Sequence, residues 1–237
     1  AVNSTADQLN KKGEIMHFET SKQTKLNLGI GGHTCNWGTH ICGLFESELE
    51  RDNIVSGLLR QGVLDKDQQY YIHTNNNDME VKTKLESEFT EDNSCFANYR
   101  NIKYTQAETY YRNKDKVSAS KLKQKLMDIN KENEIMGPFK VRAIGEMPSS
   151  TVSAFDEYEL ADYESWVNDF IVDKPWLCFC LYNINKFSGS TIMQILQTHP
   201  YILNRGVITH NPFYTPPDQW IENNKKFFKG KKGNGKQ

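Results

Sequence analysis

The sequence predicts an α/β protein, a three-layer sandwich with a mostly parallel central sheet. Short apolar segments of strand length alternate with longer segments whose apolar residues recur every three or four positions, the spacing of an amphipathic helix. Residues 176–182 form an almost unbroken apolar run without a charge, which is typical of a central parallel strand covered on both faces. Strands that alternate with helices along the whole chain indicate one sheet whose parallel strands are joined by helices.

The predicted strands are short apolar segments bounded by turn residues. They cover residues 41–45, 70–73, 102–107, 139–144, 176–182 and 206–209. At the first strand, the period of two places His40, Cys42 and Leu44 on one side of the sheet. Ile41 and Phe45 are expected on the other side.

The predicted helices carry their apolar residues on one face. They cover residues 47–61, a segment around Val81 and Leu85, and residues 118–134, 157–172 and 188–198. The first of these helices begins at a Ser47-x-x-Glu50 pattern, in which each side chain can bond the backbone amide near the other. Gly62 follows this helix as its expected C-cap.

The chain length of 237 residues is sufficient for one large domain with a buried core. We expect a flexible leader over residues 1–28 and a single α/β domain over residues 29–218. Residues 219–237 are rich in lysine and glycine, and we expect a basic, disordered tail there.

Composition and charge are those of an ordinary soluble globular protein, with 37% apolar and 25% charged residues. A formal net charge of −1 gives no overall attraction to nucleic acid or to an anionic membrane. No apolar run approaches the length of a membrane span, and the amino end lacks a basic-then-apolar signal segment. The chain has five cysteines, an odd number, so we expect reduced thiols and a cytoplasmic location.

The turn after the first predicted strand is unsuited to binding phosphate. A phosphate loop needs glycines there, so that backbone N–H groups can reach the phosphate oxygens. Here the turn has no glycine and no lysine, and it carries the carboxylates Glu46, Glu48 and Glu50. The glycine-rich segment 29–32 lies before the strand, on the wrong side of it. We therefore expect neither an ATPase nor an NAD enzyme.

Two His-x-Cys pairs lie close together near the first strand: His33 with Cys35, and His40 with Cys42. The turn at residues 36–38 contains a glycine and could fold the first pair back onto the second. Thiolate and imidazole groups favour zinc or another transition metal, so these four residues are the candidate metal ligands. The competing interpretation is that Cys42 packs in the core, because cysteine is among the most buried residue types and this spacing is not that of a zinc finger.

Four other residues have a functional and a structural interpretation. Glu146 comes just past a predicted strand, where open α/β sheets place their ligand crevices, but it could instead cap a helix or pair with Arg142. His199 is expected to end a helix rather than to act as a base. Cys178 and Cys180 share one face of the central strand and are expected to pack as small apolar side chains.

Five segments in order carry a resemblance to a known family. They are residues 39–46 (THICGLFE), Arg142-x-x-Gly145-Glu146-Met147, Cys180-x-Tyr182 with Phe187, Thr198-His199-Pro200, and Asn211-Pro212-Phe213-Tyr214-x-Pro216-Pro217. Over residues 38–218 the chain resembles the MEDS domain, the methanogen/methylotroph sensory domain.

The resemblance implies a cytoplasmic sensory module, similar in layout to RecA-like domains that have lost the phosphate loop. It implies a detector of small hydrocarbon or one-carbon (methylated) derivatives, as in dichloromethane-response regulators. Members of the family are coupled to DNA-binding or signalling domains in transcription regulation. This sequence shows no helix-turn-helix or kinase segment, so we expect its output to pass through a partner protein or through a domain outside this sequence. A homodimer is compatible with the sequence.

On this basis we expect a ligand pocket at the carboxyl ends of the strands, and no nucleotide cofactor. Its expected lining residues are His40, Cys42, Glu146, Tyr182, Phe213 and Tyr214. The alternative is a metal- or thiol-dependent transferase acting on methyl or thiol compounds, which needs an activated thiolate beside a base or a metal. The sequence offers no acid and base at a recognisable spacing, so we assign no catalytic residue and favour the sensory interpretation.

Overall fold

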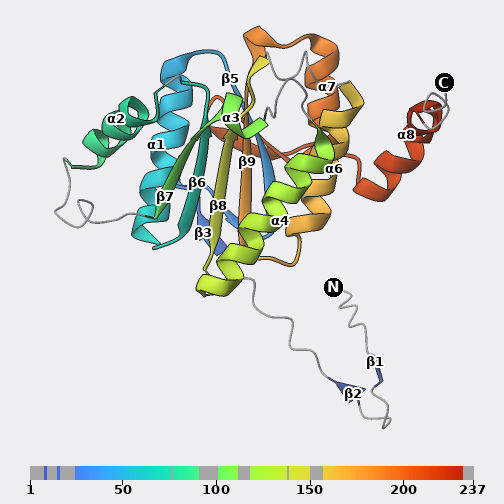
Figure 1. Cartoon of the computed structure of the whole chain (residues 1–237), viewed down its shortest axis with the longest axis horizontal. Coiled ribbons are helices and arrows are strands. Elements are labelled where there is room, and N and C mark those ends of the chain that lie inside the picture. Colours follow the sequence, from blue (N-terminus) through green and yellow to red (C-terminus); the bar gives the residue numbers. More distant parts are fainter. Residues whose placement is uncertain are drawn as a thin grey trace.

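The computed structural model has a central sheet with helices on both faces, as Figure 1 shows. It describes residues 8–9, 15–16, 25–75, 77–90, 101–111, 118–137, 139–149 and 157–231. The predicted three-layer α/β fold is therefore confirmed.

The central sheet has seven strands in the order β11-β10-β5-β9-β8-β6-β7. These strands are β5 (Thr39–Phe45), β6 (Gln68–His73), β7 (Ile102–Gln106), β8 (Val141–Glu146), β9 (Trp176–Asn183), β10 (Tyr201–Asn204) and β11 (Val207–His210). All neighbouring strands pair in parallel except β10 with β11. The sheet is thus mostly parallel, as predicted, while the short strand β10 was not foreseen.

Two antiparallel pairs lie outside this sheet. They are β1 (Gln8–Leu9) with β2 (Ile15–Met16), and β3 (Lys25–Asn27) with β4 (Thr34–Asn36).

The described helices agree in place with those that the sequence predicts, with two additions, α3 and α8. The helices are α1 (Glu48–Leu64), α2 (Asp78–Thr90), α3 (Ala107–Tyr111), α4 (Ala119–Met136), α6 (Glu157–Ile171), α7 (Gly189–Thr198) and α8 (Pro217–Lys231), with a 3₁₀ turn over Ile184–Lys186. Within the described part of the chain, none of these helices has the length and apolar character needed to cross a bilayer.

The alternation of side chains along β5 builds two separate cores, as the period of two predicts. Cys42 and Leu44 pack in the apolar cluster that includes side chains of α3, α4, α6 and α7. Ile41 and Phe45 pack in the cluster on the opposite face, with side chains of α1, α2 and β3. The sheet therefore separates groups on these two faces from each other.

The folded domain begins before residue 29. Leu26 and Leu28 are fully buried in the cluster that also holds α1. Gly29 has a φ of +73° and lies so close to α1 that a Cβ atom there would stand 2.1 Å from the Gly57 carbonyl oxygen. The structured part thus extends into the segment predicted as a leader, because the predicted boundary overlooked two leucines at alternate positions.

The carboxyl-terminal segment also differs from the prediction of a disordered tail from residue 219. Helix α8 extends to Lys231 and lies against α6 and α7. Its anchor is Trp220, which is only 2% exposed. The prediction rested on the lysines and glycines of this segment and overlooked Trp220. Residues 232–237 lie outside the described residues.

Candidate functional site

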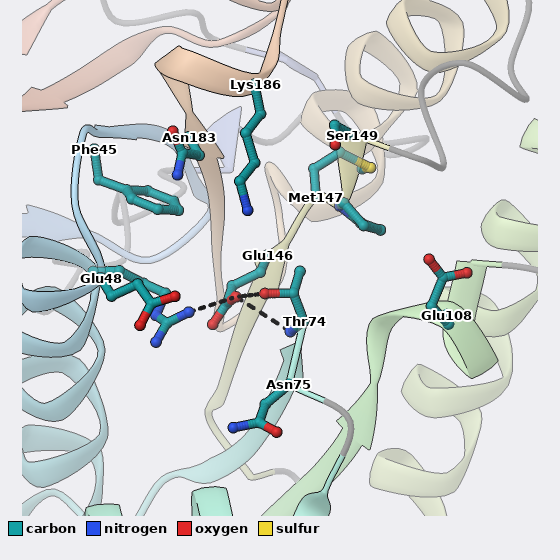
Figure 2. A pocket seen from close by; sticks show the side chains of 12 residues that line it. Phe45, Glu48, Thr74, Asn75, Glu108, Glu146, Met147, Ser149, Asn183 and Lys186 are labelled. Atoms are coloured by element: carbon teal, nitrogen blue, oxygen red, sulfur yellow. Dashed lines mark hydrogen bonds and ion pairs between the residues drawn. The ribbon is translucent and has the colours of Figure 1, made fainter.

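A cavity of about 400 Å³ opens at the carboxyl edge of the parallel strands (Figure 2). Its lining is mostly polar and carries charges of both signs. The lining residues are Phe45, Glu48, Arg51, Thr74, Asn75, Glu108, Glu146, Met147, Pro148, Ser149, Asn183 and Lys186. Several of them end or directly follow β5, β6, β8 and β9, and this edge is where open α/β sheets bind their ligands.

Glu146, the last residue of β8, is buried in the wall of this cavity. Its Oε1 accepts a hydrogen bond from the Tyr71 hydroxyl. Its Oε2 accepts bonds from the Thr74 hydroxyl at 2.6 Å and from the Thr74 amide at 3.2 Å, and it lies 3.7 Å from Nη1 of Arg51. The carboxylate is therefore fixed in one orientation by groups from β6 and α1.

The partners of Glu146 are themselves held in place. Burial raises the pKa of Tyr71 well above its usual value, and the neighbouring Glu146 charge raises it further, so the hydroxyl remains a donor. Arg51 also donates to Asp52 through Nε and Nη2, at 3.0 and 2.8 Å. A smaller cavity of about 150 Å³ adjoins this group, and it shares Arg51 and Glu146 with the larger cavity.

The segment that joins β5 to α1 forms part of the same edge. Ser47 caps α1, because its side chain accepts a hydrogen bond from the Glu50 amide at 3.2 Å. The Glu50 carboxylate in turn accepts from the Glu46 amide at 2.9 Å, one residue before the N-cap amide that the usual capping box bonds. Two amides that could have bound a phosphate are thus occupied by the chain's own side chains.

A second polar group lies where β5 and β9 meet α6 and the end of α7. It consists of His40 on β5, Glu164 on α6, Cys180 on β9 and His199 directly after α7. One nitrogen, oxygen or sulfur atom from each side chain lies within 4.8 Å of those of the other three. Among the described residues this is the group that could hold a metal ion.

Distances within this cluster converge on Oε2 of Glu164. Nε2 of His40 lies 3.4 Å from it, Sγ of Cys180 lies 3.6 Å from it and Nε2 of His199 lies 3.7 Å from it. Nε2 of His40 is also 3.3 Å from Sγ of Cys180. The other oxygen, Oε1, accepts a bond of 2.7 Å from the Tyr182 hydroxyl.

Burial disfavours the charged forms of these groups. It lowers the pKa of both His40 and His199 to about 3, and it raises the pKa of Glu164 and of Cys180. The thiols are therefore poor nucleophiles as they stand, since the thiolate is the reactive form. This environment gives no support to a thiol-dependent transferase.

The structure divides the four predicted metal ligands among different places. Nε2 of His33 lies 3.1 Å from the Gly206 carbonyl oxygen, at an exposed position. Cys35 packs against the core on the α1 face, where burial raises its pKa to about 11, whereas Cys42 is buried on the α6 face. Only His40 belongs to the cluster around Glu164, and the turn at Gly38, with a φ of +82°, does not bring the two pairs together.

The six predicted ligand-binding residues are likewise separated. Glu146 lines the cavity at the strand ends, while His40 belongs to the buried cluster and Tyr182 donates a hydrogen bond to Glu164 in that cluster. Cys42 is fully buried. Phe213 is half-exposed and Tyr214 is partly buried, and neither lines one of the two cavities described above.

Several site residues were missed by reasoning from the sequence. Glu164 had a signal: it lies between Leu160 and Val167 on the apolar face of α6, where a carboxylate is out of place. His199 does end α7, as predicted, but its ring also turns into the cluster. Tyr71 and Thr74 carried no such signal, because only the pairing of β6 with β8 brings them to Glu146.

Comparisons with known structures support the fold. The flagellar accessory protein FlaH from Methanocaldococcus jannaschii is similar with a TM-score of 0.52 and 13% identity, over 79% of this chain and 84% of that chain. The KaiC-like protein PH0186 from Pyrococcus horikoshii OT3 is similar with a TM-score of 0.51 and 11% identity, over 76% and 79%. These likenesses show a RecA-like fold and nothing about activity. No curated protein matches the chain significantly.

A family model described as "MEthanogen/methylotroph, DcmR Sensory domain" matches residues 39–200. The match covers more than half of the chain, including β5, both cavities and all four residues of the buried cluster. The resemblance stated from the sequence is thereby confirmed, and the chain belongs to the MEDS family of sensory domains.

Proposed function

We propose that this protein is a small-molecule sensor whose ligand binds in the cavity at the carboxyl edge of the sheet. The observation that carries the proposal is the fixed, buried carboxylate of Glu146 in the wall of a polar cavity. Because this carboxylate is already ordered before a ligand binds, little conformational entropy is lost on binding. It can therefore contribute to the affinity and fix the orientation of the ligand. Membership of a sensory family supports the same role.

The cavity chemistry narrows the ligand class. The family points to hydrocarbon or one-carbon derivatives, but the lining contains Glu48, Glu108 and Glu146 together with Arg51 and Lys186. A bare hydrocarbon would leave these charges desolvated without partners, which is costly. The volume of about 400 Å³ is also that of a site for a whole organic molecule. Methylated derivatives that carry charge fit better, and a zwitterionic methylated amine matches both signs.

We propose that ligand binding is transmitted to a partner protein, which is a signalling or DNA-binding protein. The cavity lies against the amino end of α1 and the segments after β6, β8 and β9, so a ligand there would contact several elements at once. A ligand that orders these segments changes the surface available to a partner.

A metal- or thiol-dependent transferase is the second candidate, and the buried cluster is the observation in its favour. Two features favour the sensor instead. None of the four cluster residues lines the polar cavity, and His40, Glu164 and His199 are each at most 1% exposed, which leaves a substrate little access to the cluster. A four-ligand site also lacks the open position that metal catalysis uses.

The first test is to identify what the protein carries. The full chain, purified without added ligand, is analysed by native mass spectrometry and its small molecules are then extracted and identified. We expect a polar, methylated compound that is lost in Glu146→Gln and retained in Glu132→Gln, an exposed carboxylate on α4 that does not line the cavity. A compound retained equally by both variants would place its site elsewhere and contradict the proposal.

A further inference from the structure

The buried cluster of His40, Glu164, Cys180 and His199 lies apart from the ligand cavity and serves no purpose in the sensory proposal. We propose that these four residues form a structural zinc-type site, which binds one divalent transition-metal ion and joins helices α6 and α7 to the sheet. The inference goes beyond the proposed function, because none of the four residues lines either cavity at the strand ends.

Ligand spacing is the first argument. A tetrahedral zinc ion with bonds of about 2.0–2.3 Å holds its ligand atoms about 3.3–3.8 Å apart. The measured separations are 3.3 Å for His40 to Cys180, 3.4 Å for His40 to Glu164, 3.6 Å for Cys180 to Glu164 and 3.7 Å for His199 to Glu164. Four of the six ligand-to-ligand separations thus match the edges of a coordination tetrahedron, and the other two, from His199 to His40 and to Cys180, are within 4.8 Å.

The orientation of His199 is the second argument. Its Nδ1 lies 2.7 Å from the Ile195 carbonyl oxygen, which can only accept, so Nδ1 carries the proton. The lone pair is then on Nε2, which points into the cluster and has no hydrogen-bond partner among the described groups. This nitrogen is fully buried, and an unpaired buried acceptor is costly unless something binds it. A metal ion would bind it.

Two of the surrounding contacts, those made by His199 and Glu164, are typical of a metal site. Metal-bound histidines normally donate their other ring N–H to a carbonyl or carboxylate, as His199 does to Ile195. The carboxylate of Glu164 is oriented by the Tyr182 hydroxyl at 2.7 Å. Tyr182 itself is fully buried, so this second contact is also shielded from water.

Charge balance supports a dication. A thiolate from Cys180 and a carboxylate from Glu164 contribute two negative charges, and the histidines are neutral. One divalent ion makes the buried site neutral overall, which removes the cost of burying isolated charges. Mixed nitrogen, sulfur and oxygen ligands favour zinc and its neighbours over magnesium or calcium.

A bound metal ion is expected to stabilise the folded state. The four ligands come from β5, α6, β9 and the end of α7, which are distant in sequence. An ion that binds all four stabilises the packing of two helices on the sheet, because it binds the folded state and not the open chain.

The test measures metal in the full chain, produced without a histidine tag and analysed by inductively coupled plasma mass spectrometry. We expect about one zinc ion per chain in the wild type, and near-complete loss in Cys180→Ser and His199→Ala. The matched controls are Cys35→Ser and His33→Ala, which change the same residue types outside the cluster and should retain the metal.

A spectroscopic measurement covers the case in which a cluster variant fails to fold. The wild type is stripped with a chelator and titrated with Co²⁺, whose complexes report thiolate and tetrahedral ligation. We expect saturation at about one Co²⁺ per chain, a sulfur-to-cobalt charge-transfer band and a higher thermal midpoint than that of the stripped protein. The same band should appear in Cys35→Ser.

Three results would overturn the inference. One is metal-free wild type that shows no saturable Co²⁺ binding. Another is saturable binding without a charge-transfer band, which would exclude Cys180 as a ligand. The third is loss of metal in Cys35→Ser or Cys42→Ser while Cys180→Ser keeps it. None of these results bears on ligand binding in the Glu146 cavity, so the metal-site proposal and the sensory proposal are tested independently.

Discussion

Arg142 is a cation with no exposed surface, and each of its nitrogens has an acceptor. Its Nε donates to Asp67 and its Nη2 donates to Asp65, both at 2.7 Å, and Nη1 donates to the Asn27 carbonyl oxygen at 2.9 Å. The side chain therefore joins β8, the segment after α1 and the strand β3. The sequence suggested Glu146 as a possible ion-pair partner of Arg142. The two residues lie at opposite ends of β8, so they do not pair.

Replacing Arg142 should destabilise the fold strongly. Arg142→Met leaves Asp67, which is 1% exposed, without its compensating cation, and such losses cost about 3–5 kcal/mol of unfolding free energy. Denaturant unfolding followed by circular dichroism measures the change. Lys131→Met, at an exposed site on α4, should change the unfolding free energy by less than about 0.5 kcal/mol. Equal stability of the two variants would contradict this role for Arg142.

Asp52 gives a prediction for acid pH. Burial alone would raise its pKa, but hydrogen bonds and charges from Lys84 and Arg51 outweigh burial and lower the pKa below 3.8. Because the folded pKa is below the unfolded one, this stabilisation is complete above pH 3.8 and is lost as the pH falls through the folded pKa.

Unfolding measured from about pH 5 to about pH 3 should therefore show a steeper loss of stability for wild type than for Asp52→Asn. The control is Asp128→Asn, which removes an exposed carboxylate on α4 and should keep the wild-type slope. If stability fell with pH as steeply in Asp52→Asn as in wild type, the ion pairs of Asp52 with Arg51 and Lys84 would contribute nothing to stability at acid pH.

At the scale of elements, Gly62 shows why helix ends are hard to predict. The sequence suggests a C-cap at Gly62, but α1 continues to Leu64 and is capped by Asp65. The glycine is required by packing instead: a Cβ atom there would stand 2.3 Å from Oε1 of Gln69 and 2.9 Å from Cδ of Arg142. Such close approach of a helix to β6 and β8 has no signature in the local sequence.

Gly62→Ala should therefore destabilise the protein by about 1–3 kcal/mol, the usual cost of overpacking a core. At a helix position without close neighbours the same change would be favourable, since alanine is the better helix former by about 1 kcal/mol. Gly189→Ala tests this difference, because a Cβ atom at Gly189 meets nothing within 4 Å. Thermal or denaturant unfolding of both variants gives the comparison, and a stabilised Gly62→Ala would refute the packing explanation.

Much of the element order follows from the sequence because periodicity is a local property. The strands β5, β6, β8 and β9 and the helices between them were predicted from apolar spacing. Helix α8 and strand β10 were not, since each depends on a distant surface: α8, with Trp220 buried, lies against α6 and α7, and β10 pairs with β5. The candidate site was only partly predictable for the same reason. Glu146 was identified from its position at a strand end, but Glu164 and His199 meet His40 only in the folded chain.

At the scale of the whole molecule, the protein has a RecA-like fold, but the segment between β5 and α1 is unsuited to binding nucleotide phosphates. The amides of Glu46 and Glu50 are bonded by side chains of the same segment, and three carboxylates surround the first turn. We predict no tight ATP binding and no ATP hydrolysis, measured by calorimetry and by phosphate release. ATP turnover that is abolished by a substitution at Glu46 or Ser47 would contradict this prediction.

The most direct test of the sensory proposal is a calorimetric titration of the full chain with glycine betaine, a zwitterionic methylated amine. Trimethylammonium, methanol and dichloromethane serve as smaller comparison compounds. The account predicts saturable binding of glycine betaine, tighter than that of the comparison compounds and weakened at least tenfold in Glu146→Gln, about 1.4 kcal/mol. Glu132→Gln should bind as wild type does. Undiminished binding in Glu146→Gln, or no binding of any of the four compounds to wild type, would contradict the placement of a methylated ligand in this cavity.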